Sequence, residues 1–110
     1  MSKIYAISSS GKSEKSFLDL RFGKSEYIVI FDRDSNQEQI IENPYKNNDY
    51  SGVQLVKFLH EKGVSVIITG EVGPQVSKVL EKEELQLVLL HEEKIKIEDI
   101  INRIRSGKQN

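Results

Sequence analysis

Apolar residues are grouped in short blocks along this chain, and the spacing within each block indicates a strand or a helix. Four continuous apolar runs, rich in β-branched residues, predict buried strands at residues 4–7, 27–31, 64–69 and 85–90. A more polar run at 37–42 predicts a strand nearer the sheet edge. The turn residues at 32–36 join it to the preceding strand as an antiparallel hairpin.

Three other segments have apolar residues at helical spacing. Their apolar positions are Leu55, Val56 and Leu59; Val76, Val79 and Leu80; and Ile97, Ile100, Ile101 and Ile104. Gly63 suits the end of the first helix and Pro74 the first position of the second. Residues 12–24 have weak periodicity and predict an extended loop. The order β-β-β-α-β-α-β-α predicts an α/β fold with three α/β/α layers, a mixed five-stranded sheet and ribonuclease H-like topology.

Composition narrows the function classes. A chain of 110 residues predicts one domain over 1–110, with a flexible polar tail at 107–110. The net charge of −1 provides no basic field for nucleic acid or an anionic membrane, so we expect neither partner. Cysteine is absent, which excludes thiolate ligands. No signal peptide or apolar run of about 20 residues occurs, so we expect a cytoplasmic protein.

Two turns of the predicted fold suggest a ligand site. Ser9 and Ser10 follow the first strand, whereas Gly70 and Gly73 follow the fourth. If these strands are parallel neighbours, the two turns form one crevice at the carboxyl ends of the strands, where α/β sheets bind ligands. Arg21 could reach an anion there with its planar guanidinium group. We therefore predict an anion-binding site of these five residues and no metal-ligand set.

Several of these segments together resemble a known family. The matching segments are Arg21-Phe22-Gly23, Tyr27-Ile28-Val29-Ile30-Phe31-Asp32, Ile41-Glu42-Asn43-Pro44, Gly52, Leu59-His60-Glu61-Lys62-Gly63-Val64 and Val66-Ile67-Ile68-Thr69-Gly70-Glu71-Val72-Gly73-Pro74. In this order and spacing they resemble the dinitrogenase iron-molybdenum cofactor biosynthesis family, which includes NifX-type carriers and the C-terminal domain of NifB-type proteins. The resemblance extends from Ile4 to about Leu90.

The resemblance implies a non-enzymatic carrier of a small ligand or metal-cluster precursor, with an iron–sulfur or iron-molybdenum cofactor precursor as cargo. Nitrogenase-linked members often carry His before the Phe-Gly pair, whereas this chain has Arg21. His60 and His91 are its only histidines, and their separation is not a metal-ligand spacing. A surface or helix-capping role is the simpler interpretation of both.

Other interpretations also have support in the sequence. A module that docks a partner protein without any cofactor would explain the lack of thiolates. Residues 6–13 fit a permissive phosphate-loop pattern, which would make the chain a nucleotide-binding protein if a helix followed the loop. A nuclease is disfavoured, because the first strand contains no acidic residue and Asp32 and Asp34 fit turn positions.

Overall fold

The computed structural model describes residues 3–92 and 94–107. Its elements follow the predicted order: β1 (Ile4–Ser9), β2 (Tyr27–Asp32), β3 (Gln37–Glu42), α1 (Ser51–Glu61), β4 (Val66–Thr69), α2 (Pro74–Lys82), β5 (Gln86–Leu89) and α3 (Ile97–Arg105). The predicted tail at 107–110 lies, apart from Gly107, outside the described residues. No helix in the described part of the chain is long and apolar enough to cross a membrane.

The five strands form one mixed sheet in the order β3-β2-β1-β4-β5. β2 is antiparallel to both β1 and β3, whereas β4 runs parallel to both β1 and β5. The β2–β3 turn forms as the sequence predicts: the Asp32 carboxylate accepts the Asp34 N–H at 3.0 Å, and Asn36 adopts a positive φ. The predicted α/β class and topology are thus confirmed.

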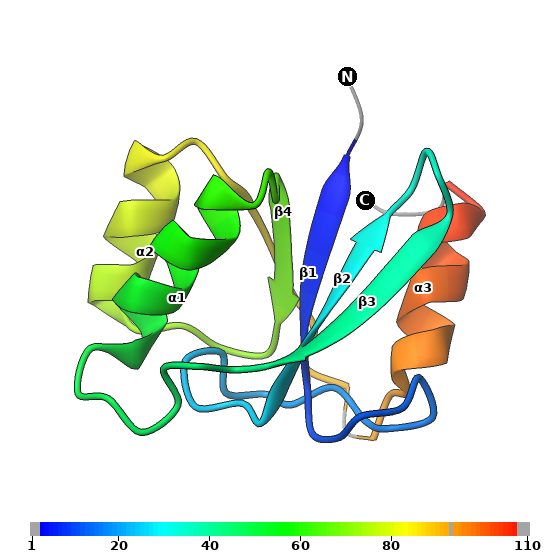
Figure 1. The fold of residues 1–110 in the computed structure, drawn as a ribbon, viewed down its shortest axis with the longest axis horizontal. Helices are drawn as coiled ribbons and strands as arrows, with labels where there is room; N and C mark the ends of the chain where they lie inside the picture. The colour runs from blue at the N-terminus through cyan, green and yellow to red at the C-terminus, as the bar shows by residue number, and fades with distance from the viewer. Residues whose placement is uncertain (1–2, 93, 108–110) are drawn as a thin grey trace.

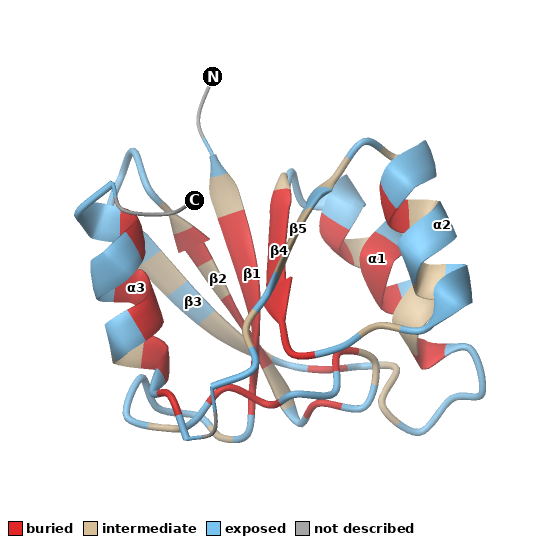
Figure 2. Ribbon diagram, turned by 180° about the vertical axis from the view of Figure 1, so that it is seen from behind, coloured by how far each residue is buried: buried red, intermediate tan, exposed pale blue. Residues whose placement is uncertain are grey.

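Helices cover both faces of the sheet, as Figure 1 shows: α1 and α2 lie on one face and α3 on the other. Each face has its own apolar cluster, since side chains alternate along a strand. Ile7 and Phe31 pack with the α3 isoleucines on one face. Ala6 and Ile67 pack with the buried residues of α1 on the other. Figure 2 shows the buried stripes on α1 and α3 turned toward the sheet.

One boundary differs from the prediction in a way that affects the site. The sequence predicts a first strand that ends at Ile7, with a polar loop after it, but β1 continues through Ser8 and Ser9. Both serines are buried. Serine can extend a buried strand here because each hydroxyl has a hydrogen-bond partner inside the protein.

Candidate functional site

The loop after β1 returns across the carboxyl ends of β1 and β4. The Asp19 N–H donates to the Ser8 carbonyl at 2.9 Å, and the Glu71 N–H donates to the Leu20 carbonyl at 2.8 Å. The Ser8 hydroxyl lies 2.6 Å from the Asp19 carbonyl and 2.7 Å from the Thr69 hydroxyl. Thus β1 and β4 are parallel neighbours, as predicted, but residues 18–21 occupy the crevice expected between them.

This loop separates the predicted site residues into two groups. The Ser9 hydroxyl donates to the Gly11 carbonyl at 2.8 Å, and the Ser10 hydroxyl donates to the Phe17 carbonyl at 3.1 Å. Gly70 is buried so closely against Leu20 that an added Cβ would lie 2.5 Å from its Cδ2 atom. Because the loop hydrogen-bonds to Ser9 and Ser10 and covers Gly70, these three residues do not line the open groove beside the loop.

Arg21 and Gly73 meet in an open groove of about 420 Å³ beside this loop. The groove lies between the loop and the first turns of α1 and α2, which begin at the same end of the molecule (Figure 1). The lining residues are Arg21, Phe22, Gly23, Lys24, Ser51, Gly52, Glu71, Val72, Gly73 and Val76.

Two glycines bring the backbones of the loop and α1 into contact at the groove. A Cβ on Gly23 would lie 2.6 Å from the backbone nitrogen of Gly52. The Asn43 side chain fixes the Gly23 turn from behind, since its Nδ2 donates to the carbonyls of Gly23 and Ser25 at 2.9 and 3.0 Å. This part of the groove is therefore held by backbone packing and buried hydrogen bonds.

Positive charge predominates among the lining side chains. Arg21 donates from Nε and Nη2 to the two Asp19 carboxylate oxygens, both at 3.3 Å. This hydrogen bonding, with the attraction of the Asp19 charge, raises the pKa of Arg21, so the guanidinium stays charged while its side chain remains 60% exposed. Lys24 donates to the Asn48 carbonyl at 2.7 Å. Glu71 supplies the opposing negative charge in the lining.

The start of α1 supplies unused hydrogen-bond donors to this groove. Its N-cap residue, Tyr50, forms no side-chain cap, and its first turn has no acidic residue. Within the described residues, the N–H groups of Gly52 and Val53 have no hydrogen-bond partner. The Ser51 hydroxyl also has none among these residues. Ser51 is only 4% exposed, but every fully buried side-chain oxygen among the described residues has a partner, so this oxygen opens onto the groove that Ser51 lines. A hydroxyl that is open to a groove at a helix N-terminus is available to a hydrogen-bonding ligand.

The start of α2 also lacks a side-chain cap and has N–H groups without partners among the described residues. Its N-cap residue, Gly73, has no side chain to cap the helix, and Pro74 occupies the first position as predicted. The N–H groups of Gln75 and Val76 find no partner in residues 3–92 or 94–107. Two partial positive charges of helix N-termini therefore add to those of the arginine and the lysine.

The chain offers few ligands for direct metal binding. His60 lies at the C-terminal end of α1, and His91 follows β5; both are exposed, and neither lines the groove. No group of three or more His, Asp or Glu residues within the described segments could hold a metal ion. The groove thus fits an anion held by charge and hydrogen bonds rather than a metal held by protein ligands.

The phosphate-loop interpretation of residues 6–13 lacks its structural context. That motif needs a helix directly after the loop. Residues 10–26, all of which are described, contain turns and isolated bridges but no helix.

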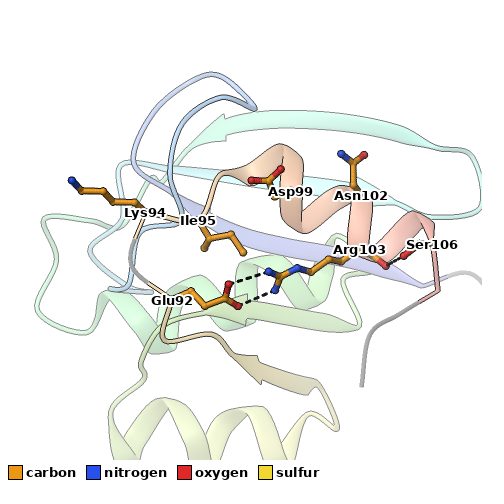
Figure 3. A pocket seen from close by; sticks show the side chains of 7 residues that line it. All are labelled: Glu92, Lys94, Ile95, Asp99, Asn102, Arg103 and Ser106. Carbon is orange, nitrogen blue, oxygen red and sulfur yellow. Dashed lines mark hydrogen bonds and ion pairs between the residues drawn. The ribbon is translucent and has the colours of Figure 1, made fainter.

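A larger hollow of about 590 Å³ lies beside α3, and Figure 3 shows its lining. Arg103 donates to both carboxylate oxygens of Glu92 there, at 2.9 and 3.0 Å. Their mutual hydrogen bonding raises the pKa of Arg103 and lowers that of Glu92. The lining of this hollow balances two cations, Lys94 and Arg103, with two carboxylates, Glu92 and Asp99. The lining of the smaller groove has two cations and one carboxylate, so the smaller groove is the better candidate for an anion.

Sequence reasoning identified two of the groove residues, Arg21 and Gly73, and missed Lys24, Ser51 and Gly52. The Arg21-Phe22-Gly23 segment and Gly52 were visible as parts of the family pattern. Nothing in the sequence showed that the glycines touch, because they are far apart in the chain.

Solved structures confirm this fold. The apo form of the orange protein from Desulfovibrio gigas matches with a TM-score of 0.84 at 20% identity, covering 98% of this chain and 91% of that one. A Thermotoga protein provisionally described as a NifB protein of the DUF35 family matches with a TM-score of 0.80 at 26% identity, covering 96% and 90%. A provisionally described dinitrogenase of Methanocaldococcus jannaschii matches with a TM-score of 0.69 at 15% identity, covering 100% and 94%.

The sequence comparisons give one clear result. None of the curated proteins matches the chain significantly. The family model described as dinitrogenase iron-molybdenum cofactor matches residues 1–107. Because this match spans nearly the whole chain, it shows that the chain belongs to the dinitrogenase iron-molybdenum cofactor family, whose members are linked to nitrogenase cofactor biosynthesis.

Proposed function

We propose that this protein is a non-enzymatic carrier that binds a small anion, such as a metal–sulfur cluster precursor, in the groove between Arg21 and Gly73. The observation that carries the proposal is the convergence of two uncapped helix N-termini and two cationic side chains on one groove. Family membership supports a cofactor-related cargo.

The charges of the groove favour an anion. Arg21 presents a charged planar guanidinium that Asp19 holds in place, and Lys24 adds a second positive charge. The N–H groups of Gly52 and Val76 and the Ser51 hydroxyl can donate further hydrogen bonds. Donors of this kind bind oxyanions and other compact anions at helix N-termini.

The donor chemistry also determines how a cluster could be held. Soft metal centres prefer thiolate or imidazole ligands. The chain has no cysteine, and His60 and His91 do not line the groove. A cluster precursor would therefore bind as a whole anion, through charge and hydrogen bonds to its outer atoms, and would remain free to leave. This mode of binding suits a carrier.

Tetrathiomolybdate, a compact metal–sulfur dianion with visible absorption, tests the proposal. We expect saturable binding to the wild-type protein by anaerobic absorption titration, with perturbed backbone amide signals at Gly52 and Gly73. Arg21→Ala should weaken binding by about ten- to a hundredfold, because a charge-assisted contact contributes about 1.5–3 kcal/mol and Lys24 remains.

A matched control separates a local site from general attraction to positive charge. Arg103→Ala removes an exposed arginine of α3, which lies on the other face of the sheet from α1 and α2 (Figure 1) and does not line the groove, and should leave the affinity unchanged. Equal losses in Arg21→Ala and Arg103→Ala, or no saturable binding to the wild type, would reject this function.

A protein-docking function without cofactor is the second candidate, and one observation favours it. Phe17 and Leu20, both on the loop after β1, are each 39% exposed although both are large apolar residues. Exposed apolar side chains are common at interaction sites. If the groove fails to bind anions, a loss of partner binding in Phe17→Ser and Leu20→Ser would support this alternative.

A further inference from the structure

The groove continues beyond Gly73 into a second compartment of different chemistry. This compartment has a volume of about 410 Å³, and it shares three lining residues, Gly52, Gly73 and Val76, with the first. Its other lining residues are Asp49, Tyr50, Val53, Pro74 and Gln75. The two compartments are therefore neighbours beside the first turns of α1 and α2. The Val76 side chain packs against Gly52 between them, and Gly73 borders both.

Tyr50 gives the second compartment an aromatic wall. Its side chain is 67% exposed, the highest value among the large hydrophobic residues in the described part of the chain. The backbone carbonyl of Tyr50 accepts the Gln54 N–H at 3.0 Å, so the residue is fixed as the start of α1 while its ring stays outside the core. An aromatic ring held in water beside a hollow offers a stacking surface.

The charges differ between the two compartments. Arg21 and Lys24 line the first, whereas the second contains no cationic side chain and includes the carboxylate of Asp49. Val53 and Pro74 add apolar surface near Tyr50. An anionic group is therefore favoured only at the first compartment, and the second suits an uncharged, flat or apolar group.

The junction between the compartments is open because a glycine forms it. Apart from Gly73 and its two chain neighbours, no residue has an atom within 4 Å of the position that a Cβ on Gly73 would occupy. The backbone of Gly73 has a φ of −78°, which any residue can adopt, so its lack of a side chain is not required by the turn itself. A small ligand could thus extend from Arg21 past Gly73 to Tyr50.

We propose that the cargo is an anion that carries a flat organic group. Its anionic group binds near Arg21, Lys24 and Ser51, and its organic group stacks on Tyr50. This inference rests on the proposed function and narrows its ligand class from any small anion to one of mixed character.

Two probes that differ only in the organic group test the inference. Phenyl phosphate and methyl phosphate are titrated separately into the protein, with amide chemical shifts as the readout. Phenyl phosphate should bind about three- to tenfold more tightly, the range typical of an added aromatic pair. Only phenyl phosphate should also shift the signals of Tyr50 and Val53.

Variants assign the difference to the ring of Tyr50. Tyr50→Ala should remove the preference for phenyl phosphate and leave the affinity for methyl phosphate unchanged. Tyr50→Phe should keep the preference, since stacking does not need the hydroxyl. Arg21→Ala should weaken the binding of both probes by the same factor.

The outcomes separate the two proposals. If methyl phosphate binds in an Arg21-dependent way but phenyl phosphate has no advantage, or keeps its advantage in Tyr50→Ala, the inference is overturned and the anion-binding function stands. If neither phosphate nor tetrathiomolybdate binds at Arg21, the function itself fails and the inference fails with it.

Discussion

The helices on the two faces of the sheet begin in different ways. At the start of α3, the Ile97 and Glu98 N–H groups donate to the carbonyls of Ser16 and Glu14 at 2.9 and 2.8 Å. Glu98 and Asp99 place negative charge in its first turn, and two arginines place positive charge in its last. The charges of α3 therefore balance its dipole at both ends.

The starts of α1 and α2 lack all of these features. Neither helix has a side-chain cap or an acidic residue in its first turn, and their first N–H groups have no partner in the described residues. Uncapped helix starts are not a general property of this chain, since the first N–H groups of α3 have hydrogen-bond acceptors. The contrast fits the proposal that the start of α3 contributes to stability, whereas the starts of α1 and α2 bind a ligand. Substitutions in the two kinds of helix should therefore affect stability and binding differently.

The largest change in the free energy of unfolding is expected from a substitution in the core between α3 and the sheet. Ile101 is 1% exposed and packs within the cluster between α3 and the sheet. Ile101→Ala should lower the free energy of unfolding by about 2–5 kcal/mol, because it removes buried methyl groups and leaves a cavity. Urea unfolding followed by circular dichroism measures this loss. The folded variant should bind methyl phosphate like the wild type, and a changed affinity would contradict this difference between the helices.

A substitution at the contact between Gly23 and Gly52 should have a smaller effect on stability and should also weaken binding. Gly23→Ala would place a methyl group 2.6 Å from the Gly52 nitrogen, so the loop must move away from α1. We expect a loss of about 1–3 kcal/mol in the free energy of unfolding, together with weaker phosphate binding.

Gly73→Ala is the matched control, because its added methyl group meets no atom of any residue beyond its chain neighbours within 4 Å. It should cost at most about 1 kcal/mol, the typical difference between residues at an N-cap. If Gly23→Ala and Gly73→Ala lowered the free energy of unfolding equally, close packing at Gly23 would not contribute to stability.

The smallest change in stability is expected when the start of α2 is given a cap. Gly73→Asn gives α2 a side-chain cap, and Gly73→Asp adds a cap with a negative charge, as α3 has in its first turn. Both should raise the free energy of unfolding by a few tenths of a kcal/mol to about 1 kcal/mol. Only Gly73→Asp should sharply weaken phosphate binding by charge repulsion. The melting temperature and the phosphate Kd measure the two effects, and unchanged phosphate affinity in Gly73→Asp would place the anion elsewhere.

The site was only partly accessible to sequence reasoning. Arg21 and Gly73 were found because an arginine near a glycine-rich turn suggests an anion site. Ser9 and Ser10 were included because serines after a strand suggest an open loop, yet Ser9 is buried in β1 and both hydroxyls bond within the loop. Lys24 and Ser51 gave no local signal, since their roles depend on residues distant in the sequence.

The sequence by itself determined the order of strands and helices, the hairpin, the turn glycine at Gly63 and the proline start of α2. These features follow from local spacing and local backbone preference, which a chain segment expresses by itself. Tertiary structure alone decided which part of the carboxyl end of the sheet is open. The loop at 18–21 hydrogen-bonds across β1 and β4 and closes the expected crevice, and the contact of Gly23 with Gly52 forms the groove beside it. Such long-range contacts depend on packing, which leaves no periodic pattern in the sequence.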